Sequence, residues 1–429
     1  MNGLAAAAAG LLAGVDAWER AVFSPRLPET WTGAAADAGR AELARLVDRG
    51  GGLLDRARTL ATVLADAAAL EPFDDARVAA ALVRAGRSEP VGVGPAAAGP
   101  APPAVAHWWA GLSDGERERL VVDRPELVGA LDGVPAAVRD RANRARLGAA
   151  RAATEVELTG LERSRDEVRD LGGLQEVEAR LAGVRARLGR LAAIDTAVRA
   201  GDDRALLAVD PASGRAAVAL GDVDRARDVG VVVPGFTSRA EDLPERTAEL
   251  AALRAADAAV VAWFDYPAPQ WPEVLDADRS VLGTRVAGNA SARLASFLDG
   301  VGGADAHVTA VGHSYGSLVV AQAAATSRAV DDVVLLGSPG VTPLPRQPTW
   351  VAEARWDPVA DTGWFGPDPN GLAHVHPMAT TGSVGHVDYL RPGSTSAQHV
   401  AAVIDGRSSD VVVDRTVGVG DRLRALLPR

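Results

Sequence analysis

Short apolar runs alternate with longer amphipathic segments through the second half of the chain. Four of the runs are almost continuously apolar: 229–233, 259–264, 308–311 and 332–336. Segments with a helix-like spacing of apolar residues lie near 243–256, 286–298 and 318–326. Strands this apolar are typical of parallel sheets whose two faces are both covered. The pattern predicts an α/β domain over residues 201–429, with a mostly parallel sheet and helices on both faces.

Four further elements complete this domain. Ala205–Val209 and Ala216–Leu220 are β-type runs separated by the turn Asp210–Gly214, which contains Pro and Gly. This arrangement predicts a β-hairpin. A later strand is predicted over Trp350–Trp356 and a last helix over Ser396–Ile404.

The first half of the chain has helical periodicity instead. Leucine and valine recur at helical spacing within residues 1–88, which predicts an all-α N-terminal region. Residues 89–105 are rich in Pro, Gly and Ala, so we expect a linker that cannot hold a helix. Residues 106–200 are predicted to be helical again. There, Leu112-Ser113-Asp114 has the composition of a helix cap.

A heptad-like seam runs through the end of this helical part. Its members are spaced three and four residues apart: Leu174, Val177, Leu181, Val184, Leu188 and Leu191. The seam is shorter than three heptads, which favours an intramolecular helical hairpin over an intermolecular coiled coil. Gly172-Gly173 is expected to break the helix just before the seam.

The N-terminal region raises the question of export. Trp31-Thr32-Gly33 lies between two predicted helices and resembles the turn of WXG-type helical hairpin proteins of type VII secretion; an ordinary helix–helix corner is the alternative. Gly3–Val15 is apolar, but it is not preceded by the basic residue that a secretory signal requires. No apolar run is long enough to span a membrane. We therefore expect a cytoplasmic protein, with a type VII-like export route left open. The N-terminal helices are candidates for binding a helical partner or for self-association.

Composition excludes several kinds of chemistry. The net charge is −11 and no basic stripe is present, which argues against a nucleic-acid partner. Every basic residue is Arg, so Walker A loops, Schiff bases and Ser–Lys dyads are excluded. There is no Cys, so disulfides, thiol nucleophiles and thiolate metal sites are excluded as well.

The segment Gly312–Ser317, Gly-His-Ser-Tyr-Gly-Ser, lies between the apolar run 308–311 and the helical segment 318–326. This is Gly-x-Ser-x-Gly in a strand–turn–helix setting, the pattern of a nucleophile elbow. The sharp turn needs glycines on both sides, because larger side chains would collide with the strand or the helix. Ser314 is therefore the predicted nucleophile.

A serine nucleophile needs a base to take its proton, and histidine suits this role. His386 lies in the loop just before the last predicted helix, where α/β domains with a nucleophile elbow carry their base. His374 and His376 in a Gly/Pro-rich loop, and His399 in the last helix, are alternatives. His313 adjoins the nucleophile and cannot fold back onto it.

A carboxylate must then orient the imidazole, and in this fold it lies between the serine and the histidine in the chain. Asp357 is predicted to end the late strand, which would aim it at the edge of the sheet where ligands bind. Asp361 and Asp368 are rivals in the following loop. Asp331 and Asp332 precede their strand and so lie at the wrong end of the sheet.

An oxyanion intermediate needs preorganised N–H donors. The backbone N–H of Tyr315, directly after the nucleophile, is one candidate. The other is the N–H of Phe236, in the loop 234–238 that follows the strand 229–233. A plain Pro-Gly turn is the alternative interpretation of that loop.

Taken in order, these segments resemble an actinobacterial family of α/β-hydrolases of uncharacterised function, over about residues 106–406. The matching segments of the predicted α/β domain are Val231–Gly235, Gly312–Ser317, Gly337–Gly340, Asp357–Val359 and His386–Tyr389. Upstream they are Trp108-Trp109, Leu131–Pro135, Arg139 and Ala142–Arg144. The resemblance implies the α/β-hydrolase fold and supports Ser314, Asp357 and His386 as a triad. It implies no substrate.

The leading hypothesis is a serine hydrolase that cleaves a small ester or related acyl substrate without a metal or organic cofactor. An acyltransferase with the same residues is one alternative. A non-catalytic, partner-binding helical module on a hydrolase scaffold is the other. Several tryptophans could line an acyl pocket or simply pack in the core: Trp263, Trp271, Trp350, Trp356 and Trp364.

Overall fold

The computed structural model describes residues 101–414, apart from 274–275, 277, 282, 304, 356, 358 and 361–362. All of these residues belong to one compact unit, Val93–Arg429. The predictions for residues 1–100, including the Trp31-Thr32-Gly33 turn, lie outside the described residues.

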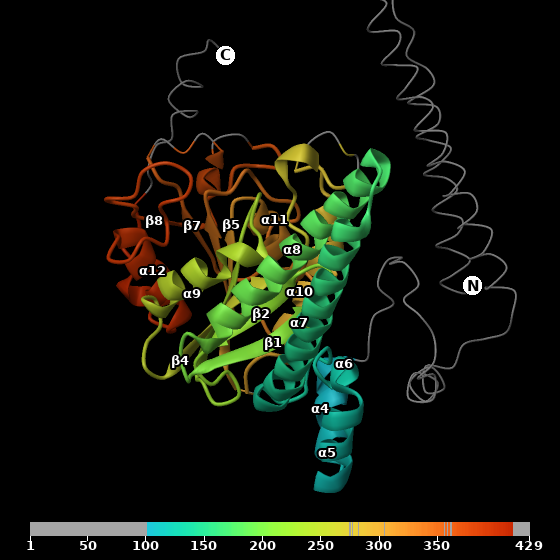
Figure 1. Ribbon diagram of the computed structural model, residues 1–429. Coiled ribbons are helices and arrows are strands. Elements are labelled where there is room, and N and C mark those ends of the chain that lie inside the picture. Colours follow the sequence, from blue (N-terminus) through green and yellow to red (C-terminus); the bar gives the residue numbers. More distant parts are fainter. Residues whose placement is uncertain are drawn as a thin grey trace, which may run out of the picture. The chain divides into compact units, whose positions relative to one another are not determined.

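An eight-stranded sheet forms the centre of this unit, in the order β1-β2-β4-β3-β5-β6-β7-β8 (Figure 1). The strands are β1 (Arg204–Asp210), β2 (Arg215–Leu220), β3 (Asp228–Val233), β4 (Ala258–Phe264), β5 (His307–His313), β6 (Asp332–Leu336), β7 (Thr349–Ala352) and β8 (His376–Met378). The strand β2 is antiparallel to β1 and β4, and all other pairs are parallel. This confirms the mostly parallel sheet, and the predicted hairpin is β1–β2.

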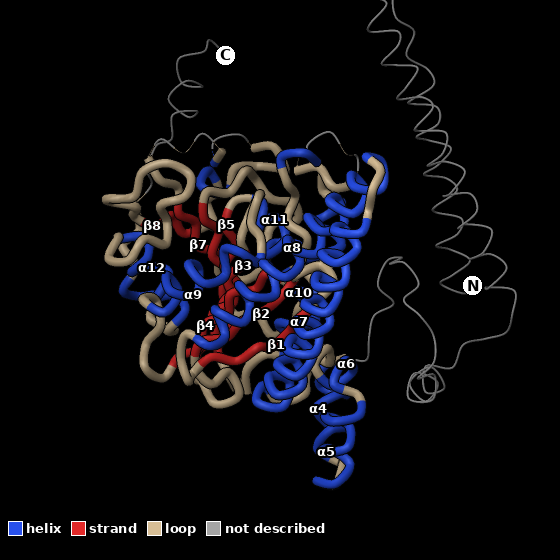
Figure 2. The backbone as a smooth tube through the Cα atoms, in the orientation of Figure 1, coloured by secondary structure: helices blue, strands red, loops and turns tan. Residues whose placement is uncertain are grey.

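Helices cover both faces of the sheet (Figure 2). They are α4 (Pro102–Ala110), α5 (Asp114–Asp123), α6 (Pro125–Val128), α7 (Ala136–Glu167), α8 (Leu171–Arg199), α9 (Leu243–Ala251), α10 (Arg285–Gly300), α11 (Tyr315–Ala324) and α12 (Thr395–Ile404). Short 3₁₀ turns are η1 (Ala240–Asp242), η2 (Trp271–Glu273), η4 (Pro369–Gly371) and η5 (Ser408–Asp410). Val231 of β3 belongs to the core that includes residues of α10 and α11, whereas its neighbour Val232 belongs to the core that includes residues of α8, α9 and α12. Alternate residues of one strand thus feed two separate cores, which is why the strand is apolar throughout.

The helices α7 and α8 form an antiparallel pair. Arg151 of α7 bonds to Asp195 of α8 at 2.6 Å, while Arg185 of α8 bonds to Glu162 of α7 at 3.1 Å. At one end of the pair, the seam residues Val177, Leu181 and Val184 pack with Leu161 in a small core of their own.

The other end of the pair joins the main sheet. The predicted domain boundary at residue 200 falls between α8 and β1, yet Ile194 and Leu206 share one core. Gly172-Gly173 does not break the helix as expected. Both glycines lie in the first turn of α8, where Asp170 caps the helix by accepting from the Gly173 N–H at 2.8 Å.

Three further expectations need correction. The helix α4 begins at Pro102, inside the expected linker, because proline is tolerated in the first turn of a helix. The strand β7 ends at Ala352 rather than at Trp356. His376 was expected to lie in a loop, but it begins the strand β8, which was not predicted because it contains Pro377; β8 is an edge strand, where a missing N–H is tolerated. The cap predicted at Ser113 is confirmed, with Glu116 accepting from the Ser113 N–H at 2.9 Å.

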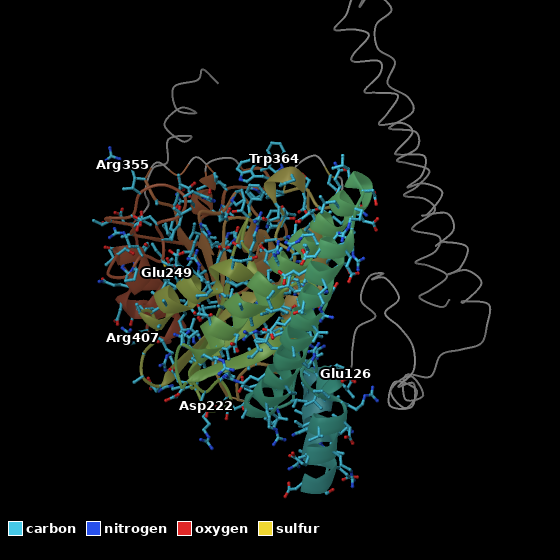
Figure 3. The ribbon with its side chains drawn as sticks, viewed as in Figure 1. Glu126, Asp222, Glu249, Arg355, Trp364 and Arg407 are labelled. Carbon is cyan, nitrogen blue, oxygen red and sulfur yellow. The ribbon has the colours of Figure 1, made fainter. Side chains whose placement is uncertain are left out.

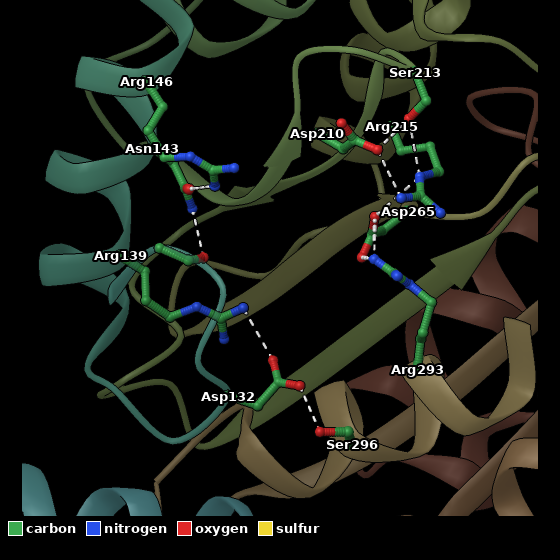
Figure 4. Close-up of polar contacts among 11 residues, drawn as sticks. Asp132, Arg139, Asn143, Arg146, Asp210, Ser213, Arg215, Asp265, Arg293 and Ser296 are labelled. Atoms are coloured by element: carbon green, nitrogen blue, oxygen red, sulfur yellow. Dashed lines mark hydrogen bonds and ion pairs between the residues drawn. The ribbon is translucent and has the colours of Figure 1, made fainter. Parts of the chain in front are cut away.

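Polar side chains tie α7 and α10 into this framework (Figure 4). Asp132 pairs with Arg139 of α7 at 3.0 Å. Asp265, which follows β4, pairs with Arg293 of α10 at 2.9 Å. Burial raises the pKa of the Asp265 carboxyl, although the charge of Arg293 acts in the opposite direction. Asp132 and Arg139, two upstream residues of the family resemblance, thus make a structural ion pair. No helix among the described residues is long and apolar enough to cross a membrane.

Candidate active site

Ser314 lies in the turn between β5 and α11, with φ 54° and ψ −127°. A Cβ at Gly312 would lie 2.6 Å from the Ser317 Cα, and a Cβ at Gly316 would lie 2.5 Å from the Val233 carbonyl oxygen. Neither contact is tolerable, so the close packing of β3, β5 and α11 requires both glycines. A non-glycine residue with positive φ marks stored backbone strain, which is common where a side chain must be presented for chemistry.

The three predicted triad residues lie within hydrogen-bonding distance of one another. His386 Nε2 is 2.7 Å from Ser314 Oγ. Its Nδ1 is 3.0 and 2.9 Å from the two carboxylate oxygens of Asp357. The imidazole is 23% exposed, while the Asp357 side chain is completely buried. The contacts are those of a nucleophile, a base and an orienting acid in series.

Asp357 is held by donors from several directions. The Tyr389 hydroxyl donates to its Oδ2 at 2.5 Å, and the Val359 N–H donates to its Oδ1 at 2.8 Å. Burial alone would raise the pKa of Asp357. The hydrogen bond to His386 and the charge of His386, together with the hydrogen bonds from Tyr389 and Val359, outweigh burial and hold this pKa below its ordinary value. The carboxylate is therefore charged near neutral pH, as an orienting group must be.

The route of the chain to Asp357 differs from the prediction. The strand β7 ends at Ala352, and Asp357 follows a turn in which its own N–H donates to the Ala354 carbonyl at 3.2 Å. The Ala354 N–H in turn donates to the Tyr389 hydroxyl at 2.9 Å. Asp357 is thus placed by a turn anchored on Tyr389 rather than by a strand end.

The alternative histidines make other contacts. His374 and His376 are exposed, and the His376 ring stacks on Trp350 with 4.6 Å between centroids. Buried His399 bridges two backbone groups, with its Nδ1 3.1 Å from the Ala379 carbonyl oxygen and its Nε2 accepting from the Val412 N–H at 3.2 Å. None of these rings contacts Ser314.

The alternative aspartates also have structural partners. Asp368 caps η4 by accepting from the Asn370 N–H at 2.9 Å. Asp331 accepts from the Val308 N–H at 2.8 Å, and Asp332 bonds to His307 at the opposite edge of the sheet. Asp361 lies outside the described residues.

The loop that follows β3 packs directly on Ser314. A Cβ at Gly235 would lie 2.6 Å from the Ser314 Cβ. The Tyr266 hydroxyl braces the loop by donating to the Pro234 carbonyl at 2.5 Å. Thr237 has a strained φ of 68°, and Phe236 packs edge-on against Trp271, with 4.8 Å between ring centroids. The loop is thus rigidly held beside the hydroxyl.

The two predicted N–H donors belong to Phe236 and Tyr315. Within the described residues, neither N–H donates to another protein group. The Tyr315 side chain points away from the serine and anchors α10, since its hydroxyl donates to the Gly283 carbonyl at 2.8 Å and accepts from the Ala287 N–H at 3.1 Å. Burial raises the pKa of this phenol to about 12.

Sequence reasoning missed the supporting roles of Tyr389, Gly337 and His313. Gly337 has φ 54°, and a Cβ there would lie 2.6 Å from Asp357 Oδ2, so this glycine makes room for the Asp357 carboxylate. The His313 ring reaches His386 instead of Ser314, with its Nε2 2.6 Å from the His386 carbonyl oxygen. Gly337 and Tyr389 lay in the segments of the family resemblance, but no spacing rule pointed to their contacts.

The tryptophans divide into two groups. Trp263 is fully buried and stacks on Tyr266, and Trp350 is buried with its N–H bonded to Asp332. Trp271 and Trp364 are 72% and 60% exposed. Figure 3 shows Trp364 at the surface. Trp356 lies outside the described residues. Among those residues, no cluster of three or more His, Asp or Glu is suited to a metal ion.

Comparison with known proteins agrees with this architecture. Residues 210–345, which include Ser314, match a family model described as "Alpha/beta hydrolase". The chain has the α/β-hydrolase fold, with an eight-stranded, mostly parallel sheet.

Relatives are found in mycobacteria. The uncharacterized protein Rv2079 of Mycobacterium tuberculosis is 31% identical over 291 residues, which are 59% of this chain and 41% of that protein. The uncharacterized protein Rv0963c of the same species is 36% identical over 152 residues, which are 31% of this chain and 55% of that protein. The match therefore spans less than two thirds of either relative.

Solved structures match more distantly. Inhibited esterase B from Lactobacillus rhamnosis has a TM-score of 0.32 and 15% identity, covering 54% of this chain and 97% of that chain. A dienelactone hydrolase from Anabaena variabilis has a TM-score of 0.31 and 19% identity, covering 46% and 92%.

Proposed function

We propose that the protein is a serine hydrolase that cleaves a carboxylic ester or a related acyl bond through an acyl-enzyme. The observation that carries the proposal is the continuous contact from Ser314 Oγ through both ring nitrogens of His386 to the buried Asp357 carboxylate. Serine hydroxyls are weak nucleophiles unless a base is in contact with them, and a base is useful only in one tautomer. This arrangement meets both requirements.

In the proposed first half-reaction, Ser314 Oγ attacks the substrate carbonyl while His386 Nε2 takes the hydroxyl proton. Asp357 keeps the remaining N–H on Nδ1 and stabilises the imidazolium that forms. The imidazolium then gives its proton to the leaving group, and the ester bond breaks. Water, activated by the same imidazole, attacks the acyl-enzyme and releases the acid.

The N–H groups of Phe236 and Tyr315 are the proposed oxyanion donors. Several features support this assignment: both N–H groups lack a protein acceptor within the described residues, and both belong to backbone packed around Ser314. The loop is braced by Tyr266, so the donors need no rearrangement as negative charge develops.

A fluorophosphonate probe, which labels activated serines, tests the proposal together with hydrolysis of p-nitrophenyl butyrate. Ser314→Ala is expected to abolish labelling and to lower kcat by about 10⁴- to 10⁶-fold, since the residues of a triad act as a unit. Ser164→Ala, on the exposed face of α7, is the matched control and should label like the wild type. Absence of wild-type labelling and turnover would end the hydrolase proposal. Added alcohol should leave free acid as the main product; ester formed with the alcohol would indicate acyl transfer instead.

A further inference from the structure

His313, the residue before the nucleophile, joins the elbow to the loop that carries the base. Its Nε2 lies 2.6 Å from the His386 carbonyl oxygen, and the two imidazole centroids are 5.0 Å apart. The other side of the ring packs against Tyr389 with 5.8 Å between centroids. Because a carbonyl oxygen only accepts, Nε2 of His313 must carry the hydrogen in this contact.

The surroundings keep this imidazole neutral. Burial, together with the neighbouring His386 and Arg246, lowers the pKa of His313 to about 4, against the weaker opposing effects of its hydrogen bond to His386 and of Asp357. A neutral ring can hold the backbone of the base without adding a second positive charge beside the imidazolium that forms during the reaction. His313 is therefore unsuited to take the serine proton and well suited to hold a neighbour in place.

The base loop, residues 380–389, needs such a restraint. Its residues Val384 and Val387, on either side of the base, are 58% and 80% exposed. The Gly385 N–H donates to the Arg355 carbonyl at 2.9 Å, which fixes the loop to the segment before Asp357. Between described residues, two hydrogen bonds join the loop to the elbow: His386 Nε2 to Ser314 Oγ, and His313 Nε2 to the His386 carbonyl. The first changes during the reaction, so only the second can hold the spacing throughout.

We propose that His313 is a positioning residue that sets the distance between Ser314 and His386 by holding the backbone of the base; this rests on the proposed hydrolase function. The nucleophile and the anchor of its base are adjacent residues at the end of β5, in a turn so closely packed that neither Gly312 nor Gly316 could carry a Cβ. The position of the base loop relative to Ser314 is thus set by the elbow. A shift of the base by about 1 Å is enough to slow such a reaction about 100-fold.

Two variants differ in whether they preserve the donor. The side-chain amide of His313→Gln places an N–H near the position of Nε2, while that of His313→Asn is too short to reach. We expect His313→Asn to lower kcat for p-nitrophenyl butyrate about 10- to 100-fold, with KM changed less than about 3-fold, and His313→Gln to stay within about 3-fold of the wild type. Fluorophosphonate labelling of the Asn variant should be slow but should reach the wild-type end point.

Other results would overturn the inference. One is a His313→Asn variant with the kcat of the wild type, and another is an equal loss of kcat in the Asn and Gln variants. A third is an Asn variant whose labelling has a normal rate but a reduced end point, which would indicate a folding defect alone. If the wild type is labelled, these results count against the role of His313 alone; if it is not labelled, the hydrolase proposal itself fails. If the variants do not fold, ¹⁵N NMR of wild-type His313 decides: the neutral Nε2–H tautomer is expected from about pH 5 to 8, and the Nδ1–H tautomer would refute the proposal.

Discussion

His307 and His386 bond to carboxylates at opposite ends of the strand β5, and of the two only His386 has a serine beside it. His307 begins β5, with its Nε2 2.9 Å from Asp332 and its Nδ1 3.5 Å from Asp228. His386 meets the far end of the same strand, where it bonds to Asp357 and to Ser314. Among the described residues no hydroxyl bonds to His307. The His–Asp pair alone therefore does not distinguish the two sites.

The two sites differ because one lies where the parallel strands begin and the other where they end. At the His307 edge, the parallel strands begin, and Asp332 also accepts the indole N–H of Trp350 at 2.8 Å. The His307–Asp332 pair joins the neighbouring strands β5 and β6. At the other edge the strands end, and the turns that follow them bring a strained serine and a second loop together, as in other open α/β sheets. Under the proposed function, the serine turn is what makes one His–Asp pair catalytic and leaves the other structural.

The largest effect expected from this comparison concerns the two carboxylates. Asp357→Asn should lower kcat about 10³- to 10⁴-fold, because an amide favours the wrong imidazole tautomer. Asp332→Asn should leave kcat within about 2-fold and reduce stability modestly. Steady-state kinetics and chemical denaturation of both variants measure this. Equal activity losses would mean that the two His–Asp pairs are not functionally different.

A smaller effect is expected at two glycines that both have positive φ. Ala at Gly302 or Gly337 would be strained at about 1 kcal/mol in either place. A Cβ at Gly302 would meet Ala306 Cβ at 3.0 Å, whereas one at Gly337 would meet the Asp357 carboxylate at 2.6 Å. We expect both variants to lose stability and only Gly337→Ala to lose activity as well, by about 10- to 100-fold. A Gly337→Ala enzyme with unchanged kcat would show that the acid tolerates displacement.

The smallest effect is a dependence of stability on pH from His307. The hydrogen bond to Asp332 raises the pKa of His307, against burial, which lowers it. A raised pKa means that the stabilisation is complete below the unfolded pKa of about 6.5 and is lost as pH rises through the folded value. The difference in unfolding free energy between wild type and His307→Gln should therefore be largest near pH 6 and shrink above the folded pKa. Urea denaturation at several pH values measures it. A difference that grows with pH would contradict the assignment.

Much of the architecture was predictable because its signals are local. Near-continuous apolar runs located β3, β4, β5 and β6, since a strand covered on both faces has no polar side. The elbow was found because its glycines are required by contacts within a few residues of Ser314 and by the adjoining strand. The order of nucleophile, acid and base along the chain then narrowed the choice of partners.

The misplaced elements have a common cause. Trp350–Trp356 is apolar enough to be a strand, but β7 ends at Ala352 because the following residues turn toward Tyr389. β8 contains Pro377, which argues against a strand unless its position at the sheet edge is known. Both outcomes depend on neighbours distant in the sequence.

The amino-acid sequence by itself determined the strands β1 to β6, the strained turn at Ser314 and the residue types available for chemistry, since each follows from periodicity and backbone sterics. The tertiary structure alone decided which carboxylate and which imidazole meet that serine, and that His313, Gly337 and Tyr389 support them. These contacts join segments separated by long stretches of chain, and their distances are set by packing between elements, which no local pattern encodes.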